Sequence, residues 1–397
     1  MQYKKLAELY EEIGSTTKRL EKTSILSKFL KQLDESDRNV MYLLLGDIYP
    51  EYDERKIGIN SQLAIKAISK AVGIEEKNVI QTWKKMGDLG KVAEFLISKK
   101  KQATLHSHIL TTEKVLENLK KLPELVGKGT VGKKIALITE LLASASPKEA
   151  LYLIRTLLAD LRIGIKENTI RDAISAAFFN SDKDSLKMIQ GAIDNSNDLA
   201  SVFDVAKKRK IEDFDKIQIQ VGKPIKVMLA QKAKSIKEAF EKVGKPCAVE
   251  YKYDGFRMLI HKKGKNVTLF TRRLENVTKQ FPEVVGYIEK YVSGESFILD
   301  SEAVGFDRKT KEYKPFQSIS QRIRRKYDIE KLQKELPVEV NVFDILYYKG
   351  KSLLKEPFEK RSSIIRKIIK NVPYSIINSK QISIWNLVLG ICLGFRY

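Results

Sequence analysis

Apolar residues in the first half of the chain recur with a helical spacing. The best example is residues 146–165, SPKEALYLIRTLLADLRIGI, in which Ser146 and Glu149 predict a capping box and Pro147 takes the first helical position. One apolar stripe is predicted on this helix, formed by Leu151, Ile154, Leu158 and Leu161. The same kind of spacing extends from residue 1 to about residue 210, which indicates an all-α domain.

A second helix is expected after Asn168, with Ile170, Ala173, Ile174 and Ala177 as its inner face. The intervening RIGIKEN is then a short turn that contains glycine. Turns of this kind, next to a helix N-terminus and basic residues, can hold a phosphate backbone. From the spacing alone, a plain helical hairpin is the simpler interpretation.

The pattern changes to alternating strands after a boundary near residues 205–215. Strands are expected in CAVEYKYDGFRMLIH, NVTLFTR, SFILDSEAVGF and VEVNVFDILYY, and helices in TKQFPEVVGYIEKYV and PFEKRSSIIRKIIK. We therefore predict a multi-domain chain, with an all-α domain over residues 1–210. An α+β domain with a mixed or antiparallel sheet is predicted over residues 211–397.

The charge of the chain points to a class of partner. The chain has 73 Lys and Arg residues against 50 Asp and Glu residues, a net charge of +23, which attracts a polyanion and favours nucleic acid. Two cysteines, Cys247 and Cys392, form neither a disulfide framework nor a zinc cage, and His106 and His108 are interpreted as loop residues. The first residues lack an apolar export signal, so a cytoplasmic location is expected.

Two further stretches resemble known signals but do not meet their requirements. Residues 127–134, GKGTVGKK, approach the phosphate-loop pattern, yet Lys134 replaces the required Ser or Thr and a helical segment precedes it. We interpret them as a flexible basic turn. The C-terminal ISIWNLVLGICLGF is apolar but too short to span a bilayer as a helix.

The stretch VEYKYDGFRM, residues 249–258, carries the candidate chemistry. If it is a strand, Glu250, Lys252 and Asp254 share one face, since side chains two apart point the same way. The same rule puts Asp300 and Glu302 together in FILDSEAV, with Arg257 and Arg272 expected nearby. Such a set could bind a triphosphate with Mg²⁺. From the spacing alone, a solvated lysine in a ladder of cross-strand ion pairs is the simpler interpretation.

The motif KYDGFR resembles the K-x-D-G-x-R signature of covalent nucleotidyltransferases. LFTRRLENVT, FILDSEAV, FQSISQRIRR and NVFDILYYKG follow in order and are similar to the nucleotide-site motifs of ATP-dependent DNA ligases. The helical half, with IGSTTKRLEKTSILSKFL, LADLRIGIKENTIRDAI and VGKPIKVMLA, resembles the DNA-binding domain of archaeal and eukaryotic replicative ligases. Capping enzymes and RNA ligases share the lysine motif without this helical half.

The resemblance implies a role for each matching position. Lys252 would attack the α-phosphate of ATP and carry AMP to the 5′-phosphate of a nick in DNA, in replication, repair and recombination. Nucleotide contacts would come from Glu250, Arg257, Arg272, Glu302 and Phe343, with Asp254, Gly255 and Asp300 as supporting motif residues and Glu302 as a metal ligand. Candidate DNA contacts are Arg162, Lys166, Arg171, Arg322, Arg324 and Arg325. The expected cofactors are ATP and Mg²⁺. The expected partners are nicked duplex DNA and a sliding clamp, and the expected state is a monomer.

The C-terminal end departs from the family pattern. The later acid and lysine motifs and the oligonucleotide-binding barrel are missing, and residues 360–397 contain no Asp or Glu. We therefore expect a truncated chain with an atypical tail from about residue 380, which alone seals nicks poorly. A DNA-binding remnant without catalysis is the alternative of another class.

Overall fold

The structure is a computed structural model that describes residues 1–100, 109–228, 230–248, 250–307, 309–310, 312–325 and 327–369, and the backbone of 382–384. The chain forms two compact units, Met1–Ile217 (unit 1) and Gln218–Tyr397 (unit 2). His106, His108, Lys326, Cys392 and most of the tail after residue 380 lie outside the described residues. No described helix has both the length and the apolar character needed to cross a bilayer.

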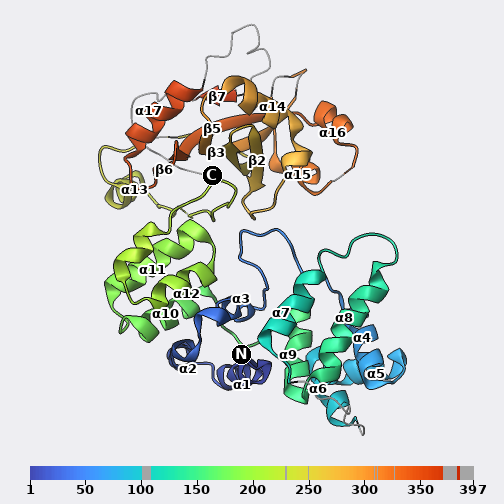
Figure 1. Cartoon of the computed structure of the whole chain (residues 1–397). Coiled ribbons are helices and arrows are strands. Elements are labelled where there is room, and N and C mark those ends of the chain that lie inside the picture. Colours follow the sequence, from blue (N-terminus) through green and yellow to red (C-terminus); the bar gives the residue numbers. More distant parts are fainter. Residues whose placement is uncertain are drawn as a thin grey trace. The chain divides into compact units, whose positions relative to one another are not determined.

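Unit 1 is helical throughout its described part (Figure 1). Its elements are α1 (Tyr3–Gly14), α2 (Arg19–Gln32), η1 (Glu35–Asp37), α3 (Val40–Leu43), α4 (Ser61–Val72), α5 (Glu76–Met86), α6 (Leu89–Ser98), α7 (Thr112–Lys121), α8 (Thr130–Ser144), α9 (Pro147–Leu157), α10 (Glu167–Phe178), α11 (Lys183–Ser196), α12 (Leu199–Lys207) and η2 (Ile211–Lys216). A single core of buried apolar side chains runs through it, from Tyr3 to Phe214. Because Phe214 of η2 belongs to this core, unit 1 ends a few residues later than the expected boundary at residue 210.

The expected helical hairpin is present, with one change. Helix α9 has the predicted capping box, in which the Ser146 hydroxyl accepts from the Glu149 N–H and the Glu149 carboxylate accepts from the Ser146 N–H. Helix α10 buries the predicted face, Ile170, Ala173, Ile174 and Ala177. However, α9 ends at Leu157, so Leu158 and Leu161 lie in the connecting loop rather than on the helix.

The interpretation of residues 127–134 as a turn is only partly right. Gly127 and Gly129 have positive φ angles of 99° and 84°, which end the preceding turn. Helix α8 then begins at Thr130, so Lys133 and Lys134 lie in its first turns rather than in a flexible loop.

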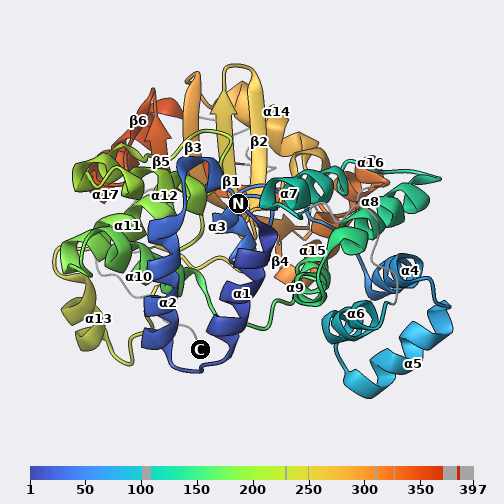
Figure 2. The same cartoon turned by 60° about the horizontal axis from the view of Figure 1, so that its bottom comes forward.

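Unit 2 is built on one sheet with the strand order β2-β1-β3-β5-β6, in which β4 pairs with β3 and β7 with β5. The strands are β1 (Phe256–Lys263), β2 (Asn266–Thr271), β3 (Ser296–Phe306), β4 (Tyr313–Lys314), β5 (Val338–Tyr348), β6 (Lys351–Ser352) and β7 (Ile382–Ile384). The helical elements are α13 (Ile236–Val243), η3 (Thr278–Gln280), α14 (Pro282–Tyr291), α15 (Phe316–Arg324), α16 (Ile329–Glu335) and α17 (Phe358–Ile368). All described pairs are antiparallel except β5 with β7, which confirms the expected α+β class (Figure 2).

The two faces of the sheet have different cover. Helices α14, α15 and α17 pack on one face, where Val284, Ile319 and Ile365 join the main core of unit 2. On the other face, the segment that opens unit 2 contributes Ile219 and Ile225 to a smaller cluster. This cluster covers only part of its face, and the polar residues of the candidate site occupy neighbouring positions on the same strands.

Candidate functional site

The segment that carries Lys252 is not a strand. Strand β1 begins only at Phe256, and residues 250–255 have an irregular backbone outside the sheet ladder, with a bend at Asp254 and Gly255. Glu250, Lys252 and Asp254 are all exposed. The argument from strand alternation was therefore wrong for these three residues, because a two-residue period holds only within a regular strand.

Gly255 connects this segment to the sheet by close backbone contact. A Cβ atom at Gly255 would lie 2.3 Å from the carbonyl oxygen of Ala303, so any side chain there would clash. The backbone N–H of Gly255 donates a hydrogen bond to the carboxyl group of Glu302. The glycine of the motif thus brings the end of the lysine segment against β3.

Arg257 and Asp300 form the most regular ion pair of the site. The Nε and Nη2 atoms of Arg257 donate to Oδ1 and Oδ2 of Asp300, each at 2.7 Å. Burial raises the pKa of Asp300, and the hydrogen bonds from Arg257 oppose that rise. The Nη1 atom of Arg257 is buried and has no hydrogen-bond partner among the described residues, so it keeps a donor for an anion.

Glu302 lies opposite Arg257 in the β1–β3 ladder and is half-buried. Burial raises the pKa of Glu302 to about 7, although the positive charge of Lys252 opposes the rise. Near neutral pH, Glu302 therefore changes between a hydrogen-bond donor and a carboxylate that could take a cation. The structure thus gives Lys252 and Glu302 a direct electrostatic coupling.

A second acid and arginine pair lies beside the first, and the sequence analysis missed it. Asp344 pairs with Asp300 across β3 and β5, and its carboxylate accepts from Nε and Nη2 of Arg361 at 2.8 and 3.0 Å. Although Glu250 is an exposed residue, partial burial of its carboxyl group, and then the charges of Asp344 and Asp300, raise its pKa. Asp344 adjoins Phe343 within NVFDILYYKG, but nothing in the sequence of α17 marks Arg361.

Arg272 and Phe343 are the other two expected nucleotide contacts, and in the part of the chain that the structure describes their side chains form no hydrogen bond or ion pair with these acid and arginine pairs. Arg272 follows β2, is exposed, and makes no side-chain hydrogen bond or ion pair within the described ranges. Phe343 is half-buried in β5, next to a register irregularity opposite Asp300 and Ser301.

No group of three His, Cys, Asp or Glu side chains in the described part of the chain could hold a metal ion. Mg²⁺ is often bound by one or two carboxylates together with substrate phosphates, and Glu302 fits that simpler arrangement.

The candidate DNA contacts fall into different environments. Arg322 is wrong as a surface contact, because it is 0% exposed, ion-pairs with Glu283 and donates to the carbonyl oxygens of Gln280 and Leu336. Its guanidinium also lies over the ring of Phe281, so it holds α15 to neighbouring elements. Arg324 and Arg325 are exposed, and Arg325 borders a hollow of about 280 Å³ between α15 and α16.

In unit 1, Arg162 and Lys166 are exposed in the α9–α10 loop. Arg171 is half-buried, and it donates to Asp172 and to Gln190. Arg162 is held by Asp160 and Asp88, and the second of these acids was not foreseen from the sequence.

Comparison with known proteins gives one consistent result. The family model "DNA ligase N terminus" matches residues 2–175, and "ATP dependent DNA ligase domain" matches residues 227–388. A DNA ligase of Nanoarchaeum equitans is 41% identical over 95% of this chain and 66% of its own length. A DNA ligase of Methanosphaera stadtmanae is 42% identical over 94% of this chain and 67% of its own length.

Solved structures add only a distant likeness. A mycobacterial DNA ligase D complexed with ATP and MES is 25% identical over 36% of this chain and 41% of its own, with a TM-score of 0.26. The chain spans about two thirds of the length of its curated relatives, 66% and 65% for two of them. On the sequence relatives and the matching domains, this chain belongs to the family of ATP-dependent DNA ligases.

Proposed function

We propose that the chain takes part in sealing nicks in duplex DNA with ATP as the energy source. Unit 2 carries out adenylation, and unit 1 contacts DNA. The observation that carries this proposal is the group Lys252, Gly255, Arg257 and Glu302, which joins an exposed amine to an arginine with a spare donor and an acid that titrates near neutrality. A cytoplasmic location stays an expectation from the sequence, and a monomeric state and a sliding-clamp partner stay expectations from the resemblance.

The first reaction is a transfer of AMP to Lys252. The deprotonated Nζ atom attacks the α-phosphorus of ATP, a P–N bond forms, the P–O bond to pyrophosphate breaks, and the amine proton goes to solvent. AMP then passes to the 5′-phosphate of a nick, which restores the lysine, and the neighbouring 3′-hydroxyl displaces AMP as the phosphodiester forms. Splitting the reaction through a covalent intermediate replaces one difficult displacement by easier ones.

The surrounding residues hold and polarise the nucleotide. The spare Nη1 donor of Arg257 and the exposed guanidinium of Arg272 suit phosphate oxygens, since guanidinium groups form strong charge-assisted hydrogen bonds with them. Glu250 provides a second carboxyl group, and Phe343 an aromatic surface for the base. A divalent cation, when bound by Glu302 and the phosphates, supplies neutralisation of charge at the reacting phosphoryl group.

Self-adenylation tests the proposal directly. The purified chain is incubated with α-labelled ATP and Mg²⁺, beside Lys252→Ala and a matched control, Lys263→Ala, in an exposed lysine at the end of β1. We expect an acid-labile label on the wild type and on Lys263→Ala, and none on Lys252→Ala. Label that persists on Lys252→Ala would exclude this lysine as the nucleophile.

DNA binding by unit 1 is tested separately. The affinity of the chain for a nicked duplex is measured over a range of salt concentrations. Because contacts between lysine or arginine and phosphates release counterions, the logarithm of the association constant should fall linearly with the logarithm of salt. Equal affinity at low and high salt would contradict a phosphate-contacting surface.

A further inference from the structure

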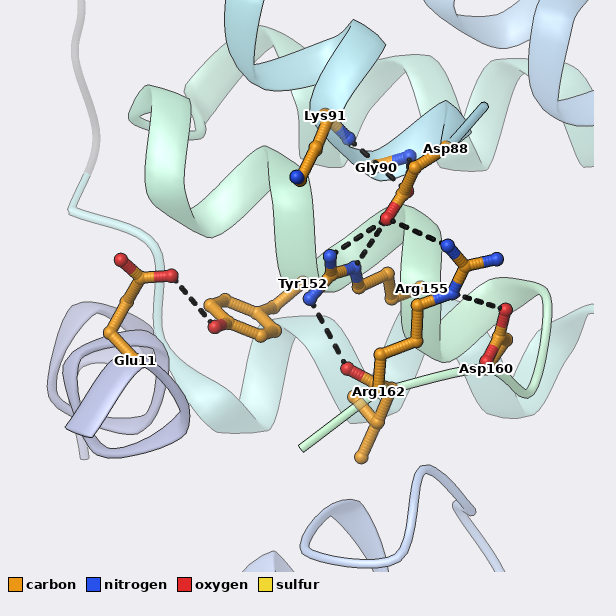
Figure 3. Close-up of polar contacts among 9 residues, drawn as sticks. Glu11, Asp88, Gly90, Lys91, Tyr152, Arg155, Asp160 and Arg162 are labelled. Carbon is orange, nitrogen blue, oxygen red and sulfur yellow. Dashed lines mark hydrogen bonds and ion pairs between the residues drawn. The ribbon is translucent and has the colours of Figure 1, made fainter. Parts of the chain in front are cut away.

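The carboxylate of Asp88, at the start of α6, collects five hydrogen bonds in unit 1 (Figure 3). Its Oδ1 atom accepts from the backbone N–H groups of Gly90 and Lys91 at 2.8 and 3.3 Å, which caps α6. Its Oδ2 atom accepts from Nε and Nη2 of Arg155 at 3.2 and 2.7 Å, and from Nη1 of Arg162 at 3.3 Å. The two oxygens therefore have different partners: Oδ1 caps the helix, and Oδ2 binds the two arginines.

Close packing of α6 on α9 makes this arrangement possible. A Cβ atom at Gly90 would lie 2.7 Å from the carbonyl oxygen of Leu151 and 2.9 Å from Cγ of Arg155. Only glycine lets the N-terminus of α6 come so near α9. Burial opposes ionisation of Asp88, but the hydrogen bonds and charge of Arg155 hold its pKa below the ordinary value, so the group is a carboxylate.

The loop that follows α9, residues 158–166, is fixed by buried cations. Nη1 of Arg155 donates to the carbonyl oxygen of Leu161 at 3.3 Å. From α2, Nζ of Lys22 donates to the carbonyl oxygens of Ile163 and Gly164 at 2.5 and 3.1 Å, and Lys22 is only 7% exposed. Arg162, with a left-handed φ of 56°, lies between these anchored carbonyls.

The guanidinium of Arg162 is held in place but keeps hydrogen-bond donors that can bind a ligand. Its Nε donates to Asp160 at 2.7 Å and its Nη1 to Asp88, while its side chain stays 48% exposed. Of the five donors of a guanidinium, the others make no hydrogen bond in the described part of unit 1. The loop itself carries Arg162 and Lys166 against a single acid, Asp160, so its own net charge is positive.

We propose that Asp88 is a positioning residue for DNA binding, which holds the loop and the guanidinium of Arg162 so that its free donors meet a backbone phosphate. The inference rests on the proposed function of unit 1. Fixing the arginine before binding reduces the side-chain entropy lost when the phosphate contact forms. If Asp88 and Asp160 only neutralised positive charge on this surface, they would instead weaken the affinity for DNA.

The two roles of Asp88 predict opposite changes in DNA affinity when its charge is removed. Asp88→Asn keeps an oxygen to cap α6, since asparagine is a good N-cap residue, but presents an amide to the arginines. Loss of one negative charge should strengthen binding to DNA if only the net charge matters. If Asp88 positions Arg162, Asp88→Asn should weaken binding to a nicked duplex by about 3- to 10-fold, and Arg162→Ala should weaken it to a similar extent.

The double variant shows whether Asp88 acts through Arg162. Arg162→Ala should lower the salt slope of binding by about one, and adding Asp88→Asn should then change the affinity by less than about twofold. Asp160→Asn, in an exposed acid outside any helix cap, should weaken binding in the same direction. Glu76→Gln, an exposed acid in α5, controls for the loss of a negative charge and should leave binding equal or slightly tighter.

Each outcome separates the inference from the function on which it rests. If the wild type binds no DNA, the proposed role of unit 1 fails. If the wild type binds and Arg162→Ala weakens it, but Asp88→Asn and Asp160→Asn bind as tightly as Glu76→Gln or more tightly, positioning by Asp88 is overturned. An Arg162→Ala variant with unchanged affinity and salt slope overturns the inference too, while binding by other residues of unit 1 stands.

Discussion

Arg257 and Asp300 are joined across β1 and β3 by two parallel hydrogen bonds of 2.7 Å, and both side chains are largely buried, at 15% and 10% exposed. The pair therefore has a structural role as well as the proposed contact with the nucleotide. Removal of one partner leaves a buried charge without compensation, which typically destabilises a protein by about 3–5 kcal/mol.

We expect Arg257→Met to lower the free energy of unfolding of unit 2 by an amount in that range, measured by denaturant titration. The double variant Arg257→Met with Asp300→Leu removes both charges and should recover much of the loss. A single variant as stable as the wild type would show that solvent already compensates Asp300.

Glu302 should make the stability of unit 2 fall as pH rises. Its pKa is about 7 in the folded state and near the ordinary value of about 4.3 in the unfolded chain, so between these values the folded state binds more protons. The stabilising protonated form is fully present below the lower value and is lost as pH rises through 7. The full difference is on the order of 4 kcal/mol.

Glu302→Gln removes this dependence. Thermal melts followed by circular dichroism should show the variant gaining stability over the wild type between pH 5 and pH 8. A constant difference between the two proteins over that range would contradict the raised pKa.

His261 should act in the opposite direction at acid pH. It is 1% exposed, burial lowers its pKa to about 3, and its Nδ1 accepts the backbone N–H of Gly222 at 2.9 Å. Between about pH 6.5 and pH 3, His261 binds a proton in the unfolded chain but not in the folded state. Its contribution to the free energy of unfolding is therefore full above about pH 6.5 and falls as the pH decreases toward 3.

His261→Phe cannot titrate. We expect it to be less stable than the wild type at pH 7, where the bond to Gly222 is lost, but to lose less stability between pH 6.5 and pH 4. Parallel acid denaturation curves for the two proteins would exclude His261 as a source of the acid sensitivity.

Gly255→Ala should disturb the segment that carries Lys252. The new Cβ would meet the Ala303 carbonyl oxygen at 2.3 Å, so the backbone must move and the hydrogen bond to Glu302 is strained. We expect self-adenylation to fall by at least about tenfold, since small misplacements of reacting groups are costly. The control is Gly286→Ala in α14, where a Cβ atom would come within 4 Å of no atom beyond the neighbouring backbone of its own helix, and it should leave labelling unchanged.

Arg322 and Arg324 provide a contrast within one helix. Arg322 is fully buried and paired with Glu283, whereas Arg324 is exposed. Arg322→Met should destabilise unit 2 by several kcal/mol in denaturant titration, since it leaves Glu283 buried without its partner. Arg324→Ala should leave the stability within about 0.5 kcal/mol. Similar stabilities for both variants would contradict the buried role of Arg322.

The sequence by itself determined the two-part organisation, most elements and the family. Helical spacing and caps are local properties, so Ser146 and Glu149 could be assigned to a capping box, and the alternating strands β2, β3 and β5 could be located. The ordered motifs around Lys252 likewise need no coordinates. Local pattern failed at residues 250–254, which alternate as in a strand although the regular ladder begins only at Phe256.

Only the tertiary structure decided which charges are free. Arg322 was expected among the DNA contacts, yet it is buried. Its partners Glu283 and Gln280 lie about forty residues away in sequence, so no local pattern could indicate the pairing. Asp88 and Arg162 are 74 residues apart in sequence and Asp344 and Arg361 are 17 apart, and no periodicity links either pair. Ion pairs of this kind depend on how helices and strands pack, and that packing decides which arginines remain free to bind phosphate.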